Sequence, residues 1–366
     1  MQALVTIPEL KAVVPELPID SSLFASIVVV DSASGKILYK KELTKAWPAA
    51  SLTKLMTTVV FTSTPTKWDG TANILSKDEV EGGRLNVPAG TKLSFRDLLY
   101  SAIVGSANNC ANALARWFDG RGVPAFVEKM NARAKLLGLE ATNFVDASGI
   151  SPKNMTTAYD IAVLLNDSSR DAEIQKAMTT PAYAFATRGP VVQKNVKNTN
   201  DMLFTNPDII VTAGKTGYLI ESKYNYVVRV HPKTDASKRL IIVVLGADSR
   251  KAGIEASASL ATWAWGAFDW RETPGTAIAE NYRQGDKGED VKRLQQFLNA
   301  NGAVIAATGP GSSGKETTLF GPLTAAALKK FQDSHKDDVL TPFGRTSGSG
   351  SLDFATRYLI QTYASK

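Results

Sequence analysis

The chain has 366 residues, of which 44% are hydrophobic and 21% are charged, with a single cysteine and a formal net charge of +7. This composition excludes a disordered chain and a disulfide scaffold, and the length predicts two or three domains. No run of lysine and arginine with interleaved aromatic residues is present. We therefore expect a mildly basic surface and no nucleic-acid partner.

Neither a membrane span nor an export signal is predicted. The longest apolar runs, at 23–30 and 240–247, are much shorter than the roughly 18 residues of a transmembrane helix and are typical of buried strands. The first residues include prolines and acidic side chains, and they lack the basic start and apolar middle of a secretory signal. An exported protein would need a signal or anchor that this sequence does not show.

The predicted elements begin with a hairpin, because residues 25–31 and 36–40 flank a cluster of turn residues. Helical periodicity follows, then three closely spaced apolar runs typical of strands, and then a last helix. The predicted helices are 51–61, 95–104, 108–118, 123–137, 157–165 and 253–268, and the strands are 209–216, 224–231 and 239–246. Strands at both ends predict an α+β domain, in which the terminal segments share a mainly antiparallel sheet covered by the helices.

The character of the sequence changes after this domain. Residues 271–284 (RETPGTAIAENYRQ) contain proline, glycine and little periodicity, which predicts a linker between a domain at 1–270 and another at 285–366. The second domain is predicted to consist of three short amphipathic helices. Their apolar faces are Val291, Leu294, Phe297 and Leu298, then Ala327, Leu328 and Phe331, then Phe354, Tyr358 and Leu359. The glycine- and serine-rich stretches 309–318 and 345–351 predict mobile loops.

Three short motifs carry the chemistry: Ser51-Leu-Thr-Lys54, Ser106-Ala-Asn108 and Lys215-Thr216-Gly217. Each alone is common in helix caps, turns and strands, but the three in order indicate a nucleophilic active site. Ser51 and Lys54 lie about one helical turn apart on one face. A lysine whose pKa is depressed by burial or by another cation can take the serine proton, and Lys215 is the obvious second cation.

The same motifs supply the remaining groups of an acyl-transfer site. Backbone N–H groups at the start of the Ser51 helix can stabilise an oxyanion, and a second donor can come from the strand carrying Lys215 to Tyr218. Ser106 can relay a proton to the leaving group, and Asn108 can hold the substrate amide.

Other chemistries fit less well. His231 and His335 fall in different predicted domains, and one cysteine cannot build a zinc-type cluster, so we expect neither a metal site nor a Ser-His-Asp triad. Cys110 lies on an apolar helix face, which is typical of a core residue. Because no glycine-rich loop has phosphate-cradling spacing, no cofactor is expected.

These motifs are the signature that penicillin-binding proteins share with class A β-lactamases. The first 270 or so residues resemble the low-molecular-mass penicillin-binding proteins, the serine-type D-alanyl-D-alanine carboxypeptidases. Further segments that look like this family are 28–41, 47–57, 88–115, 126–144, 157–162 and 198–204. The resemblance implies a penicillin-binding-protein/β-lactamase-like fold. It also implies these roles: Ser51 as acylated nucleophile, Lys54 as its base, Ser106 and Asn108 as the second motif, Lys215 as carboxylate-binding cation followed by Thr216 and Gly217, and Tyr218 as the second oxyanion donor.

Two departures from the family pattern bear on substrate preference. Asn109 stands where the family commonly has aspartate, and Lys215-Thr216-Gly217 is followed by YLIESKYNYVV without the usual Ala-Gly pair.

The tail resembles the three-helix peptidoglycan-binding module. The segments that carry this resemblance are RQGDKGEDVKRLQQFLNANG and LFGPLTAAALKKFQ.

The resemblance implies a serine DD-carboxypeptidase that removes the terminal D-Ala from peptidoglycan stem peptides through a Ser51 acyl-enzyme. Its tail would tether it to the cell wall, β-lactams would inhibit it covalently, and it would act outside the cytoplasm of a bacterium. Three alternatives stay open: a DD-endopeptidase, a β-lactamase, and a catalytically inert wall-binding protein. The β-lactamase is disfavoured because residues 139–150 (LEATNFVDASGI) lack the E-x-x-L-N phrase of class A enzymes.

Overall fold

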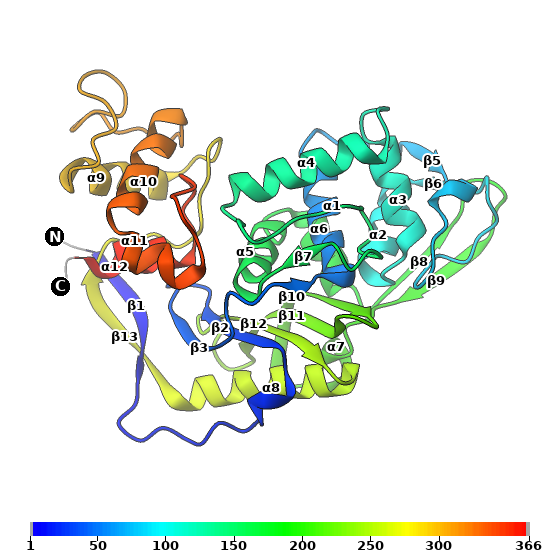
Figure 1. The fold of residues 1–366 in the computed structure, drawn as a ribbon, viewed down its shortest axis with the longest axis horizontal. Helices are drawn as coiled ribbons and strands as arrows, with labels where there is room; N and C mark the ends of the chain where they lie inside the picture. Colours follow the sequence, from blue (N-terminus) through cyan, green and yellow to red (C-terminus); the bar gives the residue numbers. More distant parts are fainter. Residues whose placement is uncertain (1–2, 364–366) are drawn as a thin grey trace.

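The computed structural model describes residues 3–363 and centres on a five-stranded antiparallel sheet (Figure 1). The strand order is β10-β11-β12-β2-β3, so strands from both ends of the first domain pair, with Leu240 opposite Asp31. The strands are β2 Ser26–Asp31, β3 Ile37–Lys41, β10 Ile209–Leu219, β11 Lys223–Pro232 and β12 Leu240–Ala247. The predicted α+β architecture is confirmed.

Helices cover both faces of the sheet, because its central strands are apolar on both sides. Ile27 and Val29 belong to the core between the sheet and α8, whereas Val28 and Val30 belong to the core on the opposite face. Figure 1 shows the long helix α8 below the sheet and α1 to α6 above it. The helices are α1 Thr53–Phe61, α2 Phe95–Val104, α3 Asn108–Trp117, α4 Val123–Leu136, α5 Ala158–Ser168, α6 Ala172–Thr179 and α8 Arg250–Ala267.

Smaller elements surround this core. A 3-10 turn, Ala50–Leu52, leads directly into α1, and the short helix α7 Met202–Thr205 precedes β10. Three short two-stranded pairs lie outside the main sheet: β4 Trp47–Pro48 with β7 Met155–Thr156, β5 Thr71–Asn73 with β6 Lys92–Ser94, and β8 Ala182–Ala186 with β9 Gln193–Lys197. Among residues 3–363, no helix is long and apolar enough to cross a membrane.

The predicted linker is wrong in its first part. Strand β13, Phe268–Gly275, pairs antiparallel with β1, Ala3–Leu10, along its whole length. The strand could not be predicted from local sequence, because its partner β1 lies far away at the start of the chain. In addition, Pro8 and Pro274 interrupt the alternation of apolar and polar residues that marks a strand. In Figure 1, the two-stranded sheet formed by β1 and β13 ends beside the tail helices.

The tail contains the three predicted helices and one short additional helix. They are α9 Glu289–Ala300, α10 Pro322–Ser334, α11 Lys336–Val339 and α12 Phe354–Thr362. The tail packs directly on the first domain, although the composition of residues 271–284 predicts a linker between them. Arg357 of α12 is fully buried and donates to Ser32 O (2.7 Å), while the Ala355 N–H donates to the Tyr159 hydroxyl (3.0 Å).

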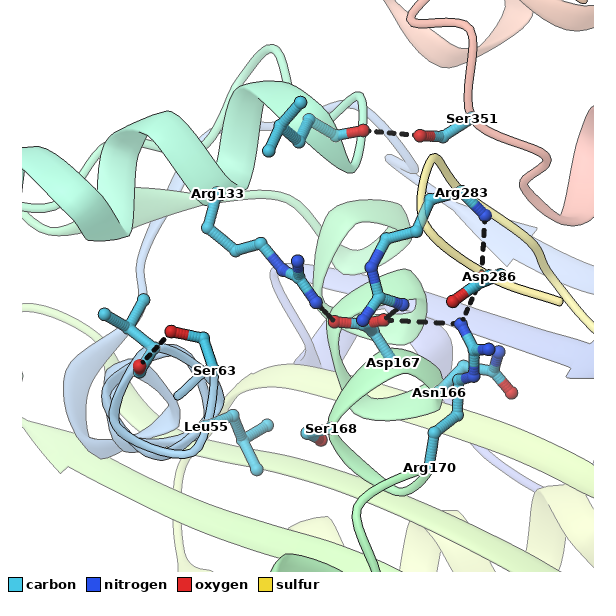
Figure 2. Close-up of polar contacts among 12 residues, drawn as sticks. Leu55, Ser63, Arg133, Asn166, Asp167, Ser168, Arg170, Arg283, Asp286 and Ser351 are labelled. Carbon is cyan, nitrogen blue, oxygen red and sulfur yellow. Dashed lines mark hydrogen bonds and ion pairs between the residues drawn. The ribbon is translucent and has the colours of Figure 1, made fainter. Parts of the chain in front are cut away.

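Polar contacts also hold the tail against the first domain, at the interface that we call the junction. Figure 2 shows Arg133 of α4 and Arg283 of the tail both directed at Asp167, at the end of α5. In the predicted mobile loop 345–351, Arg345 pairs with Asp353, and Ser351 donates to Leu136 O across the junction (2.6 Å). This loop is therefore part of the contact between the two modules.

Candidate active site

Ser51 lies in a tight turn at the start of α1. The preceding Ala50 has a positive φ of 49°, an uncommon conformation for a residue with a side chain, and it directs the chain into the 3-10 turn. Lys54 follows one turn later and is completely buried, with its Nζ 2.7 Å from Ser51 Oγ. The predicted spacing thus brings the two side chains into direct contact.

The surroundings of Lys54 define the direction of its lone pair. Its Nζ also lies 2.7 Å from Asn108 Oδ1 and 2.6 Å from Ser148 O, and both of these oxygens can only accept. A neutral amine has two hydrogens for these two acceptors, which leaves its lone pair for the Ser51 hydroxyl. Burial lowers the pKa of Lys54 to about 7, against the opposing effect of Asp146. The geometry is therefore that of a general base, the Lys54 amine, in hydrogen-bond contact with the Ser51 hydroxyl.

Ser106 and Lys215 face each other across the site. Ser106 has a positive φ of 58° in the turn between α2 and α3, and Lys215 Nζ on β10 donates to its Oγ (2.9 Å). Lys215 is buried, and burial, then Lys54, then Arg250 lower its pKa well below the usual value. The three predicted motifs thus meet in space, although they are far apart in sequence.

Strand β10 forms one wall of the site. Gly217 packs so closely against the Ser51 turn that a Cβ there would lie 3.1 Å from Ser51 N, which explains why glycine occupies this position. Thr216 donates to Thr199 (2.7 Å), and Tyr218, 52% exposed, stacks near Tyr224 with ring centroids 4.4 Å apart.

These groups line a cavity of about 240 Å³. Its lining residues are Ser51, Gly82, Gly83, Gly105, Ser106, Thr199, Thr216, Gly217, Tyr218, Tyr224, Asn225, Tyr226, Arg250 and Gly253. The cavity combines a nucleophile, the cationic side chain of Arg250 and aromatic surface, which suits a small peptide with a carboxylate.

Asn108 and Asn109 hold the rim of the cavity. Asn108 donates to Glu81 O (2.7 Å) in addition to its contact with Lys54, so its side chain binds protein groups and is less available for the predicted contact with substrate. The buried Asn109 donates to Glu79 Oε1 and Leu85 O, both at 2.9 Å. An aspartate at 109 would oppose the Glu79 carboxylate, so this departure fits the rim of this particular chain.

Sequence reasoning missed Arg250 and the loop that contains Ser148. Arg250 is the first residue of α8 and lines the cavity, with Asp201 at 3.5 Å. A cation at a helix N-terminus opposes the helix dipole, and this unfavourable placement was a usable signal. Ser148 takes part through its backbone carbonyl, which leaves no side-chain signature.

The other sequence candidates lie outside this site. Cys110 is fully buried, and burial raises the pKa of its thiol, as expected of a core residue. His231 lies on β11 and His335 follows α10, in separate parts of the fold. Within residues 3–363, no group of three or more metal-ligating side chains is found.

Fold and site together define a serine peptidase of the penicillin-binding class. The chain belongs to the D-alanyl-D-alanine carboxypeptidase family, whose profile matches residues 16–249, and a peptidoglycan-binding domain profile matches residues 287–336. It is therefore a serine peptidase that acts on D-Ala-D-Ala groups of peptidoglycan.

Individual relatives differ in their named activities. A D-alanyl-D-alanine endopeptidase of Pseudomonas aeruginosa is 34% identical over 58% of this chain and 69% of its own length. The D-alanyl-D-alanine carboxypeptidase DacC of Escherichia coli is 28% identical over 83% of this chain and 77% of its own length. The solved D-alanyl-D-alanine carboxypeptidase of Mycobacterium tuberculosis has a TM-score of 0.62 at 23% identity, covering 74% of this chain and 98% of that one, which shows the shared fold.

Proposed function

We propose that this protein is a DD-carboxypeptidase that cleaves the terminal D-Ala from peptidoglycan stem peptides through an acyl-enzyme on Ser51. The observation that carries the proposal is the contact between Ser51 Oγ and the buried Lys54 amine, whose other two neighbours only accept hydrogen bonds. Neutral Lys54 takes the Ser51 proton as Oγ attacks the carbonyl carbon of the penultimate D-Ala. The resulting oxyanion lies near the backbone N–H groups of Ser51 and Tyr218.

The leaving amine needs a proton when the peptide bond breaks. Ser106 can deliver it, since its Oγ contacts Lys215 at the wall of the same cavity, and the Lys215 ammonium then restores the Ser106 hydroxyl. Water next attacks the acyl-enzyme and gives its proton to the Ser106–Lys215 pair, while protonated Lys54 returns a proton to Ser51 Oγ as the shortened peptide leaves.

Substrate recognition is assigned to the cationic side of the cavity. Arg250 lines the cavity and can hold the carboxylate of the terminal D-Ala, because a guanidinium keeps its charge when water is excluded. Lys215 lies behind the cavity residue Ser106 and adds positive charge when it is protonated, although burial lowers its pKa. Tyr218 and Tyr224 offer aromatic surface to the stem peptide.

A β-lactam would acylate Ser51 and leave slowly. The region where class A β-lactamases carry their deacylating group holds two carboxylates here. Glu140 accepts a hydrogen bond from the Thr346 N–H of the tail (3.1 Å), and Asp146 accepts backbone N–H groups of its own loop. A water activated by a free carboxylate thus has no counterpart among the described residues that line the cavity. This supports the peptidase over the β-lactamase, and stable labelling over rapid turnover.

An endopeptidase is the second candidate, because three similar relatives, from Pseudomonas aeruginosa, Escherichia coli and Haemophilus influenzae, carry that name. It would use the same acyl-enzyme with a larger leaving group. In either case the tail module would hold the enzyme on peptidoglycan outside the cytoplasm.

The test measures D-alanine release from a D-Ala-D-Ala pentapeptide, release of monomers from cross-linked dimers, and penicillin labelling located by mass spectrometry. We expect D-alanine release and a stable adduct on Ser51, both absent in Ser51→Ala. Cleavage confined to the cross-linked dimers would establish the endopeptidase. A wild-type protein that neither turns over substrate nor is labelled would establish the inert wall-binding protein, and rapid turnover of a chromogenic cephalosporin would establish the β-lactamase.

A further inference from the structure

The loop at 146–151, which follows α4, touches the buried amine of Lys54 through a single backbone carbonyl. Ser148 O lies 2.6 Å from Lys54 Nζ, and Thr57 of α1 donates to the neighbouring Ala147 O (2.5 Å). Gly149, with a φ of +83°, packs so tightly that a Cβ there would lie 1.9 Å from Ala50 O. The loop is thus fitted closely to the turn that presents Ser51.

Asp146 organises this loop from within. Its Oδ1 accepts the N–H groups of Ser148 (2.8 Å) and Gly149 (2.6 Å), and its Oδ2 accepts the N–H of Ser151 (2.9 Å). The Gly149 N–H and the Ser148 carbonyl belong to one planar peptide group. The carboxylate therefore binds one end of this peptide, and Lys54 binds the other end.

We propose that Asp146 is a positioning residue for the Ser51 reaction: it fixes the Ser148–Gly149 peptide, and through this peptide the direction in which Lys54 presents its lone pair to Ser51. The inference rests on the proposed roles of Ser51 and Lys54. The peptide dipole lies between the carboxylate and the amine, so hydrogen bonding at the N–H end strengthens the carbonyl as an acceptor. Asp146 itself does not line the cavity.

The charged and titratable groups that act on Lys54 come from three elements. Asp146 in the loop raises its pKa, the Cys110 thiol on α3 could do so only if it were ionised, and the cation Lys215 on β10 is coupled to Lys54 by mutual repulsion. Burial raises the pKa of the Cys110 thiol, which keeps it neutral. Removing the Asp146 charge should therefore lower the pKa of Lys54 further below about 7.

The experiment compares penicillin acylation rates from pH 5 to 9 in the full-length wild type, Asp146→Asn and Asp146→Ala. Since acylation needs neutral Lys54, the wild-type rate should rise through about pH 7. We expect Asp146→Asn to move this rise to lower pH by roughly half a unit to one unit. Asp146→Ala, which also frees the loop, should be slower by about 10- to 100-fold at every pH.

Asp171→Asn is the matched control, because Asp171 likewise accepts backbone N–H groups, from Glu173 and Ile174, at the start of α6. It should keep the wild-type profile. A rate loss in Asp146→Asn without a shifted profile, or an unchanged profile, would overturn the positioning role. If Asp146→Asn does not fold, Asp146→Glu replaces it: this variant should keep the rise near pH 7 while acylating more slowly, and a shifted rise would overturn the proposal. Failure of the wild type to label at Ser51 would instead count against the proposed function.

Discussion

The active site and the junction with the tail both bury a basic side chain, but the pKa of the buried group is lowered at the active site and raised at the junction. Lys54 contacts only oxygens of uncharged groups, and burial lowers its pKa to about 7. Arg345 at the junction is also buried, but Asp353, Tyr159 and Asp160 outweigh the effect of burial and raise its pKa. A buried cation with a carboxylate partner keeps its charge and serves structure, whereas a buried amine among neutral acceptors becomes a base.

The largest effect should follow from removing the base. Lys54→Ala is expected to slow acylation by ~10²- to 10⁴-fold, because proton transfer from Ser51 then lacks an acceptor. Lys54→Arg should be similarly slow, since a guanidinium does not give up its proton. Both are measured as penicillin-labelling rates, with melting temperature as a check of folding. Wild-type labelling in Lys54→Ala would show that another group is the base.

Deleting residues 277–366 should strongly lower the stability of the remaining domain. The deletion uncovers Tyr159, which is now fully buried with its ring centroid 4.5 Å from that of Phe343. The folded fraction should still release D-alanine from a small soluble peptide at a nearly unchanged rate, while sedimenting less with purified sacculi. An unchanged melting temperature would mean that the junction stabilises nothing, and a folded but inactive truncation would mean that the tail contributes to the active site.

Arg345→Leu tests the paired cation at the junction. Asp353 would remain buried without its cationic partner, at an expected cost of about 3–5 kcal/mol in the free energy of unfolding. Adding Asp353→Asn should recover part of this loss, since an asparagine side chain can still accept from the Thr356 N–H at the start of α12 (2.9 Å). Urea denaturation measures both variants. If the double variant is no more stable than the single one, the uncompensated charge is not the cause.

The smallest effect is expected from Glu140→Gln. This side chain accepts from Thr346 at the exposed edge of the junction, and a contact of this kind contributes only about 0–1 kcal/mol. The lifetime of the penicillin adduct should not change. A much longer lifetime would show that Glu140 assists deacylation, contrary to its place at the junction.

The main strands and helices could be predicted from the local pattern of apolar and polar residues in the sequence. The apolar runs at 27–30 and 240–245 are buried strands, and α9, α10 and α12 lie where amphipathic spacing placed them. The pattern failed at β1 and β13, whose pairing joins the two ends of the domain. It also failed at 345–351, where small polar residues predicted mobility and the loop instead contacts the first domain.

For the site, the sequence by itself determined the chemical groups: a serine with a lysine one turn later, a second serine with an asparagine, and a lysine on a strand. Their types and local spacing are properties of the chain, so they could be read directly. Only the tertiary structure decided that Lys54 is buried among hydrogen-bond acceptors, which direct its lone pair to Ser51. It also decided that Arg250 and the Asp146 loop lie at the active site, and that the tail packs on the first domain. Burial, pKa and long-range contact depend on which distant segments pack together, and no local pattern records that choice.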